Sequence, residues 1–183
     1  GNQNLPSLAL MAAGNLPQGP DVPIGAQPDM VFLNDGTGLH FLDVSALTGV
    51  DDAGDSKGVA AADFDRDGDV DLFVIEQDGA PRLYRNVTPR AGRHWLEVDL
   101  VGTVSNRDGC GATIRVTTAD GVIERVVLCG SGGTGSGNER RVHVGLGTAA
   151  SIDAVEIAWP SGTRQVVDGV AVDAPLTVVE PAP

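Results

Sequence analysis

Five aspartates at alternate positions form the segment of this chain with the clearest chemistry. Residues 63–71 read DFDRDGDVD, which spaces Asp63, Asp65, Asp67, Asp69 and Asp71 two residues apart. Carboxylates brought this close repel one another unless a cation neutralises them. Calcium suits such a run because it takes about six to eight oxygen ligands in irregular geometry. The spacing therefore predicts a loop that binds Ca2+.

The order of residues within the run predicts how each would bind the ion. The first three aspartates would supply side-chain oxygens, the fourth would supply its backbone carbonyl, and Gly68 would permit the sharp turn. An EF-hand has glutamate at the twelfth position, which is Val74 here, so Asp71 is the expected closing carboxylate. The residues that follow, Leu72 to Ile75, favour a strand rather than a helix. The alternative interpretation is a solvated acidic turn.

The two cysteines flank a segment with the pattern of a β-hairpin. Residues 112–116 alternate, residues 118–121 have turn chemistry, and residues 122–128 are β-branched and apolar. A four-residue loop would place Thr117 opposite Val122 and, counting outward, Cys110 opposite Cys129. Opposed residues of antiparallel strands can form a disulfide, which implies an oxidising compartment. The alternative is two buried free thiols.

Short strands recur along most of the chain and predict an all-β protein. Residues 1–28 are rich in proline and irregular, with one apolar stretch at Leu8–Ala13 that would form a short strand or a helical turn. Strand and turn patterns then occupy residues 29–89, and a linker precedes a second strand-rich region at residues 93–180. The even spacing of strands in this second region predicts a β-sandwich or β-barrel.

The charge of the chain limits its partners. Its 183 residues carry 25 acidic and 12 basic side chains, a net charge of −13. Such a surface is a poor partner for nucleic acid, whose backbone is also negative. No apolar run reaches the roughly 18 residues needed to cross a bilayer. Residues 1–20 lack the pattern of a signal peptide and the chain begins without Met, so we interpret it as a processed chain.

Catalytic interpretations have weaker support in the sequence. The three histidines, His40, His94 and His143, are too scattered to form a zinc site with two cysteines. A triad of Ser131 or Ser136 with His143 and Asp153 lacks a nucleophile-elbow pattern, and a Cys129–His143 pair would need a free thiol. We therefore expect no enzymatic activity.

The sequence around the aspartates resembles a known repeat. Residues 58–76, with Asp63-Phe64-Asp65 and Asp67-Gly68 before Asp71-Leu72, resemble the FG-GAP or VCBS repeat, and residues 33–45 resemble the preceding part of the same repeat. Residues 94–180 resemble the ASPIC/UnbV domain. The landmarks of that second resemblance are Trp95, Ser105–Gly109, Gly111-Ala112, Val142–Gly147 and Trp159–Gly162.

The resemblance implies a fold and a location but no reaction. It implies one or two blades of an integrin-like β-propeller with a calcium loop, followed by the C-terminal β-domain, in an extracellular or cell-surface protein. A closed propeller needs at least about four blades, so the chain would be part of a larger propeller protein or would leave sheet edges open. The expected role is structural or adhesive, for example as a self-assembling subunit of an extracellular polymer.

Three further expectations concern partners and modification. The N-terminal segment would either add as a strand to a neighbouring subunit or fold back on its own chain. A calcium-dependent glycan-binding module is the alternative function, with an exposed Trp95 or Trp159 as the sugar platform; core packing is the alternative role for both indoles. Asn86 begins the only N-x-S/T sequence, Asn86-Val87-Thr88, and is the candidate glycosylation site.

Overall fold

The computed structural model of the chain describes residues 8–10, 28–51, 54–77, 79–130 and 137–182. These residues form strands and a single four-residue helix, α1 (Ser45–Thr48), so the all-β prediction is confirmed. No helix among them has the length and apolar character to cross a membrane. The strands are β1 (Leu8–Leu10), β2 (Val31–Asn34), β3 (Phe41–Asp43), β4 (Ser56–Ala62), β5 (Asp71–Glu76), β6 (Arg82–Tyr84), β7 (His94–Val101), β8 (Thr113–Thr118), β9 (Gly121–Val126), β10 (Val142–Gly147), β11 (Ala154–Ala158), β12 (Arg164–Val167) and β13 (Ala174–Val179).

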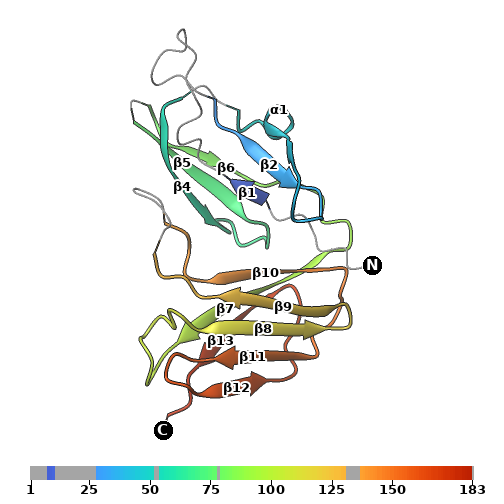
Figure 1. Cartoon of the computed structure of the whole chain (residues 1–183), viewed down its shortest axis with the longest axis vertical. Coiled ribbons are helices and arrows are strands. Elements are labelled where there is room, and N and C mark those ends of the chain that lie inside the picture. The colour runs from blue at the N-terminus through green and yellow to red at the C-terminus, as the bar shows by residue number, and fades with distance from the viewer. Residues whose placement is uncertain (1–7, 11–27, 52–53, 78, 131–136, 183) are drawn as a thin grey trace.

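Two antiparallel sheets of three strands form the upper half of the molecule in Figure 1. One has the order β1-β2-β3 and the other β4-β5-β6. The turn between β2 and β3 is held by Asn34, whose Oδ1 accepts hydrogen bonds from the amides of Gly36 (2.7 Å) and Gly38 (3.2 Å). A propeller blade has four strands, and each described sheet here has three. The assignment of these sheets to propeller blades stays a prediction.

The N-terminal segment contributes β1 to the first of these sheets. Leu8, Ala9 and Leu10 pair with Leu33, Phe32 and Val31 of β2 in the same chain. Residues 8–10 thus form a strand rather than a helical turn. Donation of the segment to a neighbouring subunit stays a prediction. The rest of the proline-rich segment, residues 1–7 and 11–27, lies outside the described residues.

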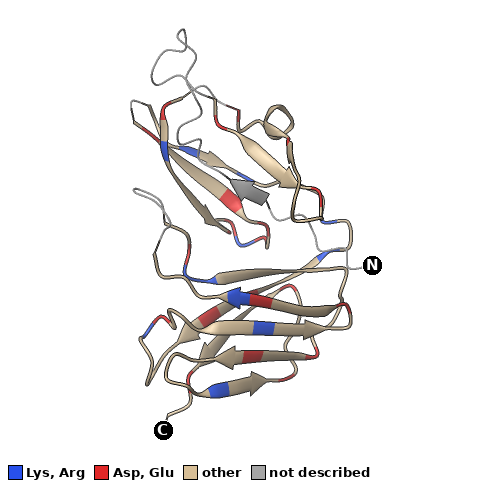
Figure 2. Ribbon diagram, in the orientation of Figure 1, with Lys and Arg blue, Asp and Glu red and all other residues tan. Residues whose placement is uncertain are grey.

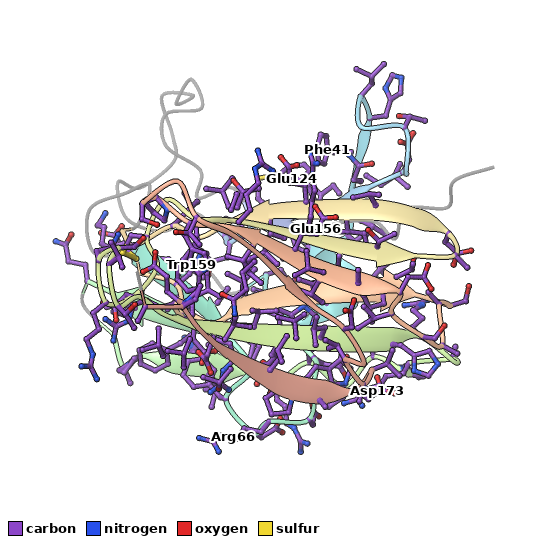
Figure 3. The ribbon with its side chains drawn as sticks, turned by 90° about the horizontal axis from the view of Figure 1, so that it is seen from below. Phe41, Arg66, Glu124, Glu156, Trp159 and Asp173 are labelled. Atoms are coloured by element: carbon purple, nitrogen blue, oxygen red, sulfur yellow. A yellow bond between two sulfur atoms is a disulfide. The ribbon has the colours of Figure 1, made fainter. Side chains whose placement is uncertain are left out.

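The lower half consists of two sheets that enclose one apolar core. The sheet β10-β7-β13 packs on the sheet β12-β11-β8-β9. Inward-facing residues of both sheets are fully buried, among them Leu96 and Val98 of β7, Ile114 of β8 and Ile157 of β11. Trp159 is 3% exposed and lies in the same core, between the ribbons in Figure 3. Acidic and basic residues alternate across the strands of the second sheet in Figure 2, as in the pair Arg115–Glu124.

The hairpin predicted between the cysteines is present, with a tighter turn than expected. Thr117 pairs with Val122 as the counting predicted, but Thr118 also pairs with Gly121, which leaves two residues in the turn. The shorter turn is possible because Gly121 adopts a φ of +133°. The register brings Cys110 and Cys129 to a Cα–Cα distance of 5.4 Å, and they form a disulfide.

The two halves differ in the size of their apolar cores. All fourteen residues of the buried cluster belong to the lower half. In the upper half, Val31, Val50, Leu72 and Val74 are the buried apolar residues among those described. The upper half is therefore held together less by apolar burial and more by backbone pairing and polar contacts.

Candidate metal centre

The aspartate run forms the loop between β4 and β5. Pairing of Ala62 with Asp71 closes the hairpin, so the first and last aspartates of the run lie at the two ends of one turn. Arg66 and Gly68 have positive φ angles of 59° and 92°, which turn the chain back on itself. The glycine was recognised in the sequence as the residue that permits this turn, and its backbone conformation fits that role.

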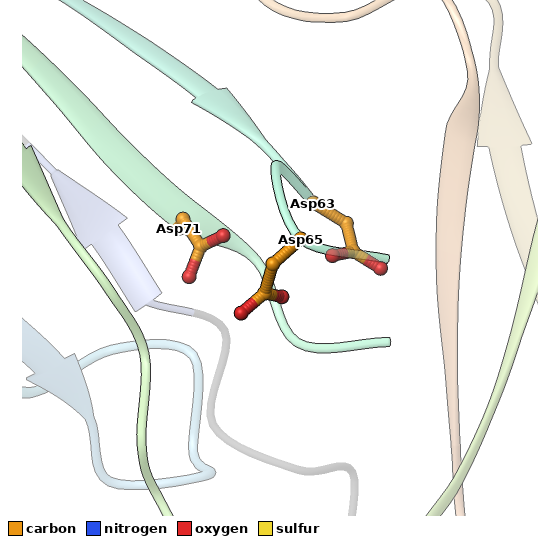
Figure 4. A group of neighbouring side chains, drawn as sticks. All are labelled: Asp63, Asp65 and Asp71. Atoms are coloured by element: carbon orange, nitrogen blue, oxygen red, sulfur yellow. The ribbon is translucent and has the colours of Figure 1, made fainter. Parts of the chain in front are cut away.

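Three of the five aspartates gather at one point. Carboxylate oxygens of Asp63, Asp65 and Asp71 all lie within 4.8 Å of one another, and Figure 4 shows Asp65 between the other two. Oxygens that bind one calcium ion at about 2.3–2.6 Å lie at most about 5 Å apart. The three side chains thus satisfy the distance that a shared calcium ion requires.

Burial and hydrogen bonds hold two of these carboxylates in place. Asp63 is 7% exposed and accepts hydrogen bonds from the amides of Asp67 (3.1 Å) and Gly68 (2.7 Å). Asp71 is 2% exposed and accepts from the amides of Phe64 (3.0 Å) and Asn86 (2.8 Å). Each carboxylate oxygen has a second lone pair. The backbone therefore orients both groups and leaves them able to bind a cation.

The other two aspartates face arginines that the sequence reasoning did not single out. Asp67 lies 3.3 Å from Nη2 of Arg85 and 3.5 Å from Nη2 of Arg90, while Asp69 lies 3.3 Å from Nε of Arg90. Arg85 also forms an ion pair with Asp65. The amide of Asp69, together with these arginines, lowers the pKa of Asp67. Arg85 and Arg90 follow β6, so only its pairing with β5 places them beside the loop.

The apex of the loop rests on the sheet of the lower half. The Gly68 carbonyl lies 2.8 Å from Nε2 of His143, and a Cβ atom at Gly68 would lie 2.1 Å from Nε1 of Trp95. Because a carbonyl only accepts hydrogen bonds, this contact requires the proton of His143 on Nε2. His143 thus donates a local hydrogen bond to the loop, as its place within a strand predicted.

Neither tryptophan that the glycan-binding interpretation relies on is exposed enough to stack on a sugar. Trp95 is 9% exposed and Trp159 is 3% exposed, so neither indole presents the open face on which a sugar ring stacks. Trp159 instead donates a hydrogen bond to Gln165 (2.9 Å) within the lower half. Both tryptophans have the alternative role of packing.

Three other candidate groups remain from the sequence: the Cys129–His143 pair, the serines at 131 and 136, and Asn86. Cys129 is in the disulfide, so the Cys129–His143 pair has no free thiol. Ser131 and Ser136 lie outside the described residues. Asn86 is half-buried, and its amide donates to Asp71, which places the candidate glycosylation site beside the metal centre; its modification stays a prediction.

A protein-family model matches the C-terminal part of the chain. Residues 102–183 match the family model described as ASPIC and UnbV. This match agrees with the resemblance noted for residues 94–180. The FG-GAP or VCBS resemblance of residues 33–76 stays a prediction.

Similar curated proteins share a short part of the chain. Cartilage acidic protein 1 of Mus musculus is 47% identical over 58 residues, which is 31% of this chain and 9% of that protein. The protein of the same name from Xenopus tropicalis is 45% identical over 58 residues, again 9% of its length. The matched stretch thus spans less than a tenth of these relatives.

Proposed function

We propose that this chain is a non-catalytic calcium-binding module of an exported protein, in which the ion has a structural role. The observation that carries this proposal is the group of carboxylate oxygens from Asp63, Asp65 and Asp71 within 4.8 Å of one another. These three side chains would hold the ion, and the side chain of Asp67 and the carbonyl of Asp69 would complete the oxygen set. Calcium would supply positive charge and would fix the loop in one conformation.

The balance of charge in the loop supports a cation. Five aspartates lie in the run, and the ion pairs described for them involve two arginines, Arg85 and Arg90. The excess negative charge is concentrated where two carboxylates are almost fully buried. Buried carboxylates of like charge destabilise the folded state unless a counter-charge is present. A divalent cation would supply that counter-charge.

A structural role fits the small apolar core of the upper half. Small domains with little buried apolar surface commonly depend on metals, disulfides or association for stability. The disulfide Cys110–Cys129 lies in the lower half, so the upper half would draw on the ion. Exposed apolar residues of β3 and the turn before it, including Leu39 (81% exposed) and Leu42 (58%), lie at a sheet edge. Such an edge supports a role in association with further repeats or subunits.

An extracellular location is supported by two observations. The disulfide is compatible with an oxidising compartment, and the relatives that match carry the name cartilage acidic protein.

The chain would act there through binding and packing, because the residues that suggested catalysis have structural partners or lie outside the described part. His143 binds the Gly68 carbonyl, and Cys129 binds Cys110.

Calcium titration of the whole chain tests the proposal. We expect calcium to raise the melting temperature relative to chelator, because an ion at about 100 times its Kd adds about 2.7 kcal/mol to the free energy of unfolding. Asp65→Ala removes one ligand at an exposed position and should abolish most of that gain. Asp120→Ala, in the exposed turn between β8 and β9, is the matched control and should retain it.

One result would refute the proposal directly. If calorimetric titration detects no bound calcium in the wild-type chain and its melting temperature is the same in calcium and in chelator, the loop is a solvated acidic turn.

A further inference from the structure

A single residue links the candidate metal centre to the lower half of the molecule. The amide of Gly68 donates to Asp63 Oδ2 at 2.7 Å, and its carbonyl accepts from His143 Nε2 at 2.8 Å. Its Cα lies against the indole of Trp95, where a Cβ would approach Nε1 to 2.1 Å. Any movement of Gly68 away from the lower sheet therefore also moves a donor away from a candidate calcium ligand.

Trp95 and His143 form the surface on which this glycine rests. They come from the adjacent strands β7 and β10, on the face of the sheet that is turned away from the apolar core. Their rings are stacked, with centroids 6.3 Å apart and an angle of 16° between the planes. The Nε1 atom of Trp95 is buried and has no hydrogen-bond partner among the described residues. The contact between Trp95 and Gly68 thus depends on shape.

A second contact joins the same two parts just before the loop. The amide of Ala61 donates to Oδ1 of Asn138 (3.1 Å), and the amide of Glu139 donates to the carbonyl of Ala61 (3.3 Å). Ala61 is two residues from Asp63, so the loop is held to the lower half both at its apex and at its entrance.

The junction also carries an excess of negative charge. Arg141 lies between Glu97, Asp99 and Glu139 on the lower side. Burial raises the pKa of Glu139; Arg141 opposes this shift, and the acidic groups Glu97, Asp99 and Asp63 add to it. A cation in the loop would reduce this repulsion between the two sides.

We infer that the lower sheet is part of the calcium site: Trp95 and His143 are positioning residues for the loop, and calcium binding is coupled to docking of the two halves. This inference rests on the proposed function. If calcium binds more tightly to the docked loop than to the undocked loop, calcium must strengthen docking by the same factor. The ion would therefore stabilise the contact between the upper half and the lower half of the molecule.

Variants of the positioning residues test the coupling in the full chain. His143→Ala removes the donor to Gly68, and Trp95→Phe removes part of the surface on which Gly68 rests without breaking a hydrogen bond. We expect each to weaken calcium binding about five- to tenfold by calorimetry. His143→Gln restores an N–H donor and should recover part of the loss. His40→Gln changes a histidine that follows the β2–β3 turn and should bind calcium as the wild type does.

Hydrogen exchange measures the reciprocal effect. In the wild type, calcium should slow exchange of the Glu139 amide, which bonds across the junction, several-fold. In Trp159→Phe, Trp95 is the only indole, and its fluorescence should change on calcium addition.

The outcomes separate this inference from the proposed function. If the wild type binds calcium and His143→Ala and Trp95→Phe bind it equally well, the loop is an independent site and the coupling is wrong, while the proposed function stands. The same conclusion follows if calcium binds without slowing exchange at Glu139. If the wild type binds no calcium, both the proposed function and the coupling are wrong.

Discussion

Carboxylates are buried both in the aspartate loop and at Glu180, and the two sites surround them differently. Glu180 is 1% exposed and follows the last strand of the lower half. It accepts hydrogen bonds from the amides of Thr103 (2.9 Å), Val104 (2.8 Å) and Ser105 (2.7 Å). The hydroxyls of Ser105 (2.8 Å) and Ser161 (2.6 Å) also donate to it.

These donors complete the environment of Glu180. Burial alone would raise the pKa of Glu180, but the hydrogen bonds from Ser161, Ser105 and Val104 outweigh it and lower the pKa to about 2. A single ionised group with five donors needs no cation. The aspartate loop instead gathers several carboxylates, and the two most buried ones, Asp63 and Asp71, have two backbone donors each. The comparison separates a carboxylate whose charge is balanced by hydrogen-bond donors from carboxylates that, in our proposal, bind an ion.

The largest loss of folding stability is expected from a substitution at Gly68, the glycine at the apex of the loop. Gly68 and Gly162 have nearly equal φ angles of +92° and +93°, but Gly162 has open space around it. Gly68→Ala should lower the free energy of unfolding by about 2–4 kcal/mol, because it adds backbone strain and a collision with Trp95. Gly162→Ala, in the turn that presents Ser161 to Glu180, should lower it by about 1 kcal/mol through strain alone.

Chemical denaturation of both variants measures this difference. Equal losses in the two variants would show that the loop does not rest on Trp95.

Removing the charge of Glu180 should give a pH-dependent effect. Because the pKa of Glu180 falls from its ordinary 4.5 to about 2 on folding, its stabilisation is complete above about pH 4.5 and is lost as the pH falls toward 2. Glu180→Gln should therefore have a lower free energy of unfolding than the wild type at neutral pH. The difference between the two proteins should become smaller as the pH falls. Glu124→Gln, an exposed partner of Arg115, is the control.

Urea denaturation at a series of pH values between 7 and 2 measures this difference in the free energy of unfolding. A difference that stays constant with pH would mean that the ionised form of Glu180 does not stabilise the fold.

The smallest effect is expected on calcium affinity, when Arg85 beside the aspartate loop loses its charge. Arg85 pairs with Asp65 and Asp67 and opposes a cation at the same carboxylates. Arg85→Gln should tighten calcium binding about three- to tenfold at low salt, since it removes one positive charge a few ångströms from the ion. Arg115→Gln, in the lower half, should leave the affinity unchanged. Calorimetric titration at low and high salt distinguishes this charge effect from a change of fold. Because salt screens charges, the gain in calcium affinity should be smaller at high salt.

Local patterns were sufficient for several features of this protein. The alternating aspartates and Gly68 predicted where a sharp acidic turn lies, because their spacing directly determines the turn chemistry. Counting outward from Thr117 and Val122 predicted that Cys110 faces Cys129, because antiparallel pairing advances one residue on each strand. The tighter two-residue turn before Gly121 was not expected.

Features that depend on distant partners could not be predicted in this way. The last strand, β13, pairs in parallel with β7, from Ala174 opposite Leu96 to Val179 opposite Val101. No local signal fixes a parallel register, because the two strands are separated by most of the lower half. The same holds for Arg85 and Arg90, which the sequence alone would leave as ordinary residues of a strand end and linker.

The sequence by itself determined the chemistry available at the loop, since five carboxylates at alternate positions have that character in any fold that brings them together. Only the tertiary structure decided which of them meet: Asp63, Asp65 and Asp71 converge. It also placed Arg85 beside Asp65 and Asp67, and Arg90 beside Asp67 and Asp69. It also decided that the loop rests on Trp95 and His143, which are encoded about 30 and 75 residues away from Gly68. The physical reason is that side-chain type is local, whereas burial and charge compensation depend on residues that only folding brings into contact.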